Sequence, residues 1–294
     1  KKDTKITKLF FITDENISNF PIESLIVKNG KEFKHIIEIY SSSYYPSLQS
    51  FLNKKDNTIN ISTQNSYLGV GNPKFTSGRK KNEIISFTRG GFLKDSRKIS
   101  FNFDELPYTK KEIDKVSLLF ENSDKLLGVD ANEEKIKDYL KKNYEVIQFA
   151  THAEVAGNFD NFNEPFLVLT PPKISNKKND GLLSLSEIYT LKLKTKLVIL
   201  SACNTATKIN EYSNGFDGIV SAFIDAGAQN VIATHWPVED NASYIMISKT
   251  IEKSVKLKIS LSESLKRTKI EFINGEYGED FKHPFYWSPF IIVG

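Results

Sequence analysis

Residues 196–203 read KLVILSAC, an apolar run that ends at the single cysteine of the chain, Cys203. Consecutive apolar residues at 197–200, followed by small and polar ones, are typical of a short strand that is buried on both faces. Residues 145–152, EVIQFATH, show the same arrangement and end at His152. The sequence therefore predicts a thiol and an imidazole at the ends of two buried strands.

Signals for helices lie between and after these strands. Such start or stop signals are found at Thr109 with Glu112, Asp130 with Glu133, Ser184 with Glu187, Gly227, and Asp240. Strands that alternate with capped helices predict an α/β fold, in which helices cover both faces of a mostly parallel sheet. In such sheets, functional sites lie outside the carboxyl ends of the strands, where Cys203 and His152 are expected.

The first hundred residues contain further strand signals. Short apolar segments at 9–12, 21–27 and 36–40 are predicted as strands separated by turns. The pattern changes near residue 108, where helical spacing begins. We therefore predict two parts, an N-terminal subdomain over 1–108 and a second domain over 109–294.

The composition argues against several classes of protein. A single cysteine among 294 residues excludes an intramolecular disulfide and a multi-cysteine metal site. We expect no metal and no cofactor. The 40 basic and 36 acidic residues give a net charge of only +4, and the scattered basic clusters argue against a nucleic-acid partner. No apolar run approaches the ~18 residues that cross a bilayer, so no membrane partner is expected. A free thiol favours a reducing, cytoplasmic setting.

Cys203 and His152 have the chemistry of a nucleophile and a base. Adjacent strands lie ~4.8 Å apart, so side chains beyond their carboxyl ends can approach hydrogen-bond distance. A cysteine nucleophile needs a histidine that accepts its proton and later protonates the leaving amine. The spacing leaves alternatives open. Cys203 can simply fill space in the core, and His235, at the end of another strand, is a rival base.

The amino-acid sequences of several segments add a resemblance that covers most of the chain. In order, they read FATH at 149–152, LTPP at 169–172, DGLLSLSEI at 180–188, LSACNTA at 200–206, AGAQNV at 226–231, WPVED at 236–240 and HPFYWSPF at 283–290. This series resembles the CHAT family, a caspase-like domain that is often attached to tetratricopeptide repeats and is related to separase. The resemblance implies a caspase-like α/β/α sandwich, with a non-catalytic caspase-like subdomain before the catalytic domain.

The resemblance also implies roles for individual residues. It implies a cysteine endopeptidase in which His152 and Cys203 form the catalytic dyad. Backbone N–H groups of Cys203 and of Ala153 would form the oxyanion hole, although family members often have glycine after the histidine. Asp240 matches the residue of separase that lines the pocket for a basic P1 side chain. The alternative for Asp240 is that it only caps the helix that follows.

Weaker candidates for the P1 pocket are Glu154, Glu239 and Asp180. The resemblance implies a specific protein substrate, cut after a basic residue, and regulation by a repeat region or partner. It also implies a possible place in bacterial defence, where some members cut gasdermin-like proteins. The chain begins at Lys1 without methionine, so we expect it to be a piece of a longer protein.

Two alternatives belong to other classes of function. One is a degenerate caspase-like scaffold that only binds a partner, which the presence of both His152 and Cys203 argues against. The other is a nucleotide-binding protein, but no strand is followed by the G-x-G-x-x-G pattern.

Overall fold

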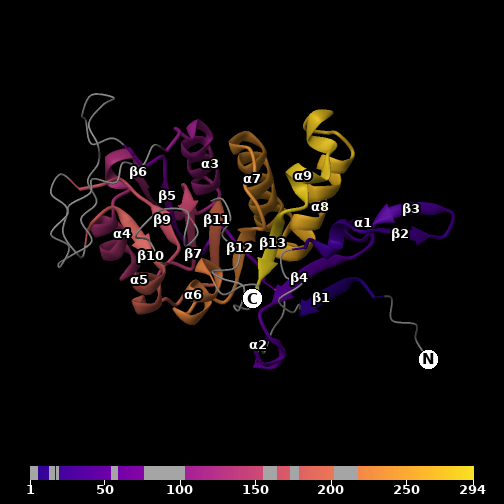
Figure 1. Cartoon of the computed structure of the whole chain (residues 1–294), viewed down its shortest axis with the longest axis horizontal. Coiled ribbons are helices and arrows are strands. Elements are labelled where there is room, and N and C mark those ends of the chain that lie inside the picture. The colour runs from indigo at the N-terminus through magenta and orange to yellow at the C-terminus, as the bar shows by residue number, and fades with distance from the viewer. Residues whose placement is uncertain are drawn as a thin grey trace.

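The computed structural model describes residues 6–12, 17, 20–53, 59–75, 103–154, 164–172, 179–201 and 218–294. One sheet has the strand order β1-β4-β13-β12-β11-β7-β5-β6. Its strands are β1 Lys8–Ile12, β4 Ser41–Tyr45, β5 Ser66–Gly71, β6 Asn122–Leu127, β7 Val146–Ala150, β11 Leu197–Ser201, β12 Val231–Thr234 and β13 Phe290–Val293. Neighbouring strands are parallel except β12 and β13, which confirms the predicted, mostly parallel sheet (Figure 1).

Helices cover both faces of this sheet. The two groups are α3 Pro107–Ser117, α7 Asp240–Leu257 and α8 Leu261–Ile273 on one face, and α4 Glu133–Leu140, α5 Leu185–Thr190 and α6 Ile219–Asp225 on the other (Figure 1). Alternate residues of a strand point to opposite faces. Accordingly, Leu197 and Ile199 of β11 lie in one buried cluster, whereas Val198 and Leu200 lie in the other. The apolar run that ends in SAC is therefore buried on both faces, as predicted.

The smaller elements lie around this sandwich. They are α1 Ile36–Ile39, α2 Leu48–Asn53, α9 Pro284–Trp287, the hairpin of β2 Ile26–Asn29 and β3 Glu32–His35, and a small sheet of β8 Ala153–Glu154, β9 Phe166–Val168 and β10 Leu182–Ser184. Among the helices of the described ranges, none is both long and apolar enough to cross a membrane.

Local signals fixed some helix starts better than others. At α5, Glu187 accepts a hydrogen bond from the Ser184 N–H at 3.0 Å, so the predicted capping box is confirmed. In contrast, α3 begins at Pro107, before the predicted Thr109, because proline fits the first turn of a helix.

The predicted strand over residues 36–40 is wrong. Residues 36–39 form α1, and the His35 N–H donates to Glu38 Oε2 at 2.6 Å, a reciprocal contact that starts a helix. Ile37 is buried in the core, so tertiary packing rewards the helical arrangement despite the strand propensity of isoleucine.

Strands from both sides of residue 108 belong to the same sheet. β5 lies between β7 and β6, and β4 pairs with β13 near the C-terminus. The division into 1–108 and 109–294 stays a prediction about subdomains, within a sheet that both parts build.

Candidate active site

The carboxyl ends of β7 and β11 lie side by side. Ser201 is in register with Ala150, and the Thr151 N–H donates to the Ser201 carbonyl oxygen at 3.3 Å. The predicted adjacency of these two strand ends is therefore confirmed. Cys203, two residues after Ser201 in the sequence, lies outside the described residues.

His152 follows β7 and has a fixed orientation. Its ring packs against Phe75 and Phe103, at centroid distances of 5.1 and 5.2 Å, and these two rings also contact each other. Its Nε2 is 2.8 Å from the backbone carbonyl oxygen of Asp104. A carbonyl oxygen only accepts, so Nε2 must carry a proton, and Nδ1 is the acceptor of the neutral ring. The half-exposed His152 is thus prepared to accept a proton at Nδ1.

Ala153, the predicted oxyanion-hole residue, starts the short strand β8. It is buried and pairs with Leu167 of β9. The described non-glycine residues with a positive φ are Asn72, Asn143 and Lys258. Ala153 is not among them, so its backbone does not need the glycine that the family often has at this position.

Asp240 is the first residue of α7 and contacts another helix. Its Oδ2 accepts a hydrogen bond from the Tyr108 N–H, in the first turn of α3, at 2.7 Å. Glu239 is the N-cap residue of α7, without a side-chain capping bond. Burial raises the pKa of Asp240, while the Tyr108 N–H, the positive charge of Lys111 and that of His152 when it is protonated oppose this rise. Asp240 therefore does more than cap its own helix.

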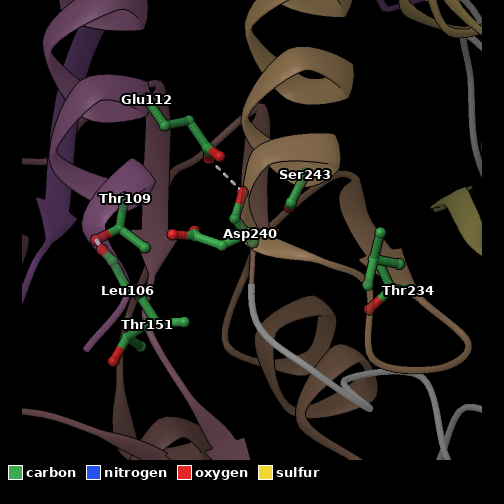
Figure 2. A pocket seen from close by; sticks show the side chains of 9 residues that line it. Leu106, Thr109, Glu112, Thr151, Thr234, Asp240 and Ser243 are labelled. Carbon is green, nitrogen blue, oxygen red and sulfur yellow. Dashed lines mark hydrogen bonds between the residues drawn. The ribbon is translucent and has the colours of Figure 1, made fainter. Parts of the chain in front are cut away.

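A pocket lies between α3, the start of α7 and the carboxyl ends of the central strands (Figure 2). Its lining residues are Leu106, Thr109, Glu112, Thr151, Ser201, Thr234, Val238, Asp240 and Ser243. Five of these nine residues carry a hydroxyl group and two carry a carboxyl group. Thr151 directly precedes His152, and the charge of a protonated His152 acts on Asp240, so the pocket lies near the predicted base, which is not itself among the described lining residues.

Glu112 is the lining residue whose role the sequence did not indicate. It is only 1% exposed, and its Oε1 accepts hydrogen bonds from Gln148 Nε2 and Ser201 Oγ. Burial raises its pKa to about 8, and the negative charge of Asp240 contributes to the rise. The one signal in the sequence was Gln148. A polar residue in the middle of a buried strand indicates that a polar partner lies nearby.

The weaker acidic candidates lie elsewhere. Glu239 is exposed, and Glu154 lies on β8, where it pairs with Phe166. Asp180 Oδ1 accepts a hydrogen bond from the Leu182 N–H at 2.9 Å. None of the three lines the pocket within the described part of the chain, so their roles stay predictions for other subsites.

His235, the rival base, is buried in a different environment. It is 3% exposed and packs edge-on against Tyr44 at a centroid distance of 5.9 Å. Both ring nitrogens lack a hydrogen-bond partner among the described residues. Burial lowers the pKa of His235 to about 4, so its ring is neutral at physiological pH.

Comparison with known proteins extends these observations. The CHAT domain matches residues 1–294. Tetratricopeptide repeat protein 28 is 25% identical over 199 residues in Mus musculus and 22% identical over 307 residues in Homo sapiens. These matches cover 58% and 92% of this chain but only 8% and 11% of the two relatives.

Solved structures with a similar fold include separase and an Arg-specific cysteine proteinase. Separase in the Saccharomyces cerevisiae separase–securin complex matches 99% of the chain with a TM-score of 0.57 and 13% identity, over 15% of its own length. The Arg-specific cysteine proteinase gingipain R matches all of the chain with a TM-score of 0.56 and 10% identity, over 64% of its own length. At this level of identity the likeness concerns the fold, which is caspase-like as the resemblance implied. With the family match over its whole length, the chain belongs to the CHAT domain family.

Proposed function

We propose that this CHAT domain is a cysteine endopeptidase in which Cys203 is the nucleophile and His152 the base. The observation that carries the proposal is the orientation of His152 beside the end of β11, the strand that leads to Cys203. With Nε2–H engaged by the Asp104 carbonyl, Nδ1 is the nitrogen available to the thiol.

The proposed reaction proceeds in two halves. His152 Nδ1 takes the proton of the Cys203 thiol, and the thiolate attacks the carbonyl carbon of the scissile bond. N–H groups of Cys203 and Ala153 stabilise the oxyanion of the tetrahedral intermediate. The imidazolium then donates its proton to the departing amine, which leaves a thioester. A water molecule that His152 deprotonates attacks this thioester, and the Cys203 thiol and the carboxyl product are released.

The pocket beside His152 supports a basic P1 residue. Asp240 presents a carboxylate among hydroxyl groups, an environment that matches a guanidinium or ammonium group. The Arg-specific gingipain R, with the same fold, supports this preference. We further propose that the natural substrate is a specific protein partner.

We propose that neighbouring regions regulate the domain. The curated relatives are tetratricopeptide repeat proteins of which the chain matches about a tenth, which supports a repeat region as the regulator. We also propose a cytoplasmic location, a role in bacterial defence and a gasdermin-like substrate.

The test is cleavage of a peptide library with varied P1 residues by the wild type, Cys203→Ala and His152→Ala. We expect the wild type to cut after Arg or Lys, and each variant to lose about 10³-fold or more in kcat. A variant that retains wild-type kcat would remove that residue from the dyad. The chain has one cysteine, so loss of activity on stoichiometric alkylation implicates Cys203 independently.

A further inference from the structure

Two carboxyl groups, not one, line the pocket beside His152. Asp240 is half-buried at the start of α7, whereas Glu112 is 1% exposed on α3 (Figure 2). We propose that Glu112 is a second acid at the floor of the P1 pocket and that it selects arginine over lysine. This inference rests on the proposed function and names the group that sets the specificity of that site.

The position of the Glu112 carboxyl group is fixed from behind. Gln148 Nε2 and Ser201 Oγ both donate to Oε1. Gln148 is fixed in turn, because its Oε1 accepts a hydrogen bond from Tyr67 Oη at 2.7 Å. A carboxyl group held through one oxygen can present the other to the pocket without an entropic loss when a ligand binds.

Arginine and lysine differ in how they can use two acids. A guanidinium carries five N–H donors in a planar fork, so one arginine side chain can bond Asp240 and Glu112 at once. A lysine ammonium is a compact, strongly hydrated charge that pairs well with the acid nearer the mouth. The floor acid therefore adds binding for arginine that lysine uses poorly.

The protonation of Glu112 gives this role a pH signature. Burial holds the pKa of Glu112 near 8, so the group is largely neutral at pH 7 when the pocket is empty. The charged or titratable described groups that act on it are Asp240 on α7 and, through Gln148, Tyr67 on β5. A bound guanidinium favours the carboxylate, so arginine binding releases a proton and strengthens as pH rises through about 8.

The first experiment compares wild type and Glu112→Gln on matched peptides with Arg, Lys or uncharged citrulline at P1. Glutamine keeps the acceptor for Ser201 and removes the charge. We expect the Arg-to-Lys ratio of kcat/KM to fall about tenfold in the variant, through KM, as loss of one charged hydrogen bond predicts. In the wild type, the Arg-to-citrulline ratio should rise between pH 6.5 and 9, whereas in Glu112→Gln it should stay flat. The ratio cancels titration of the catalytic groups.

Glu133→Gln is the matched control, because Glu133 is a buried acid on α4 that does not line the pocket. It should leave both ratios unchanged. A wild type that cuts after arginine with a pH-independent Arg-to-citrulline ratio would overturn the role of Glu112 while the protease stands. Because the pH dependence of this ratio is measured on the wild type, the test does not depend on whether a variant folds.

Binding to Cys203→Ala protein separates this inference from the proposed chemistry. Calorimetry of the arginine peptide in two buffers of different ionisation enthalpy counts the protons released. We expect binding of the arginine peptide to release close to one proton at pH 7. The double variant Cys203→Ala, Glu112→Gln should release none. If binding releases the proton but the wild type cleaves none of the peptides, the role of Glu112 stands and the proposed endopeptidase activity is overturned. Absence of binding by any of the peptides would overturn both.

Discussion

Asp240 joins two helices and presents charge to the pocket at the same time. Its carboxylate accepts from the Tyr108 N–H, and an asparagine oxygen can do the same, so Asp240→Asn should fold normally. The variant loses only the negative charge. We expect kcat/KM for both Arg and Lys peptides to fall about 10²-fold, as loss of a charged pair in a partly buried site predicts. Cleavage of a citrulline peptide should change little.

Glu239→Gln is the control for this prediction, because Glu239 is the neighbouring acid but is exposed outside the pocket. It should behave like the wild type in the same assay. An Asp240→Asn variant with unchanged preference for basic residues would assign the P1 pocket to another part of the domain.

What the sequence revealed about individual residues depended on how local their signals were. His152 and Asp240 stand at the ends of predicted elements, so their approximate positions followed from the pattern. Glu112 was interpreted only as a capping residue, because its partners Gln148 and Ser201 are 36 and 89 positions away. Such contacts depend on strand order and register, which no local pattern encodes.

Gly227 shows how an element of this fold depends on one backbone conformation. It follows α6 with a φ of +114°, and a Cβ built there would lie 2.1 Å from the Leu193 carbonyl oxygen. The Leu193 oxygen is a backbone atom, so relief requires the backbone at Leu193 or at the end of α6 to shift. We expect Gly227→Ala to lower the free energy of unfolding by about 3 kcal/mol, measured by urea denaturation.

Gly30→Ala is the matched control, because Gly30 also has a positive φ, +66°, but a Cβ there would meet nothing within 4 Å. It isolates the backbone strain, which should cost about 1 kcal/mol. Equal effects of the two substitutions would show that the contact with Leu193 is relieved by a small shift.

Among the elements, the buried strands were easier to predict than the N-terminal ones. The apolar runs that became β7 and β11 allow little besides a strand buried on both faces. Residues 36–40 combine isoleucines that favour a strand with the glutamate of a helix start. The helix is stabilised because Ile37 is buried and Glu38 accepts a hydrogen bond from the His35 N–H.

At the scale of the whole molecule, a buried polar cluster joins the N-terminal part of the chain to α8. Lys269 of α8 donates to Glu23 Oε1 at 3.0 Å, and both side chains are 0% exposed. Tyr44 Oη donates to the other oxygen of Glu23 and accepts from the Ile22 N–H at 3.1 Å. The pair joins positions 246 residues apart, so it connects the N-terminal part with the helix layer beside β13.

Removing one partner of this pair should be costly. Lys269→Met leaves the Glu23 carboxylate buried without its counter-charge, and we expect a loss of about 3–5 kcal/mol in the free energy of unfolding. The double variant Lys269→Met, Glu23→Gln removes both charges and keeps an acceptor for Tyr44. It should therefore recover more than half of that loss, measured by urea denaturation at one pH.

Lys256→Met tests whether burial, rather than pairing alone, explains this difference. Lys256 pairs with Glu252 at 2.6 Å on the surface of α7, where the lysine side chain is 61% exposed. An exposed pair is worth about 0–1 kcal/mol, because water solvates the glutamate when the lysine is gone. Two similar effects at Lys269 and Lys256 would mean that water reaches Glu23. A large loss confined to Lys269, with recovery in the double variant, would establish that the N-terminal part is joined to the rest of the domain through a desolvated charge pair.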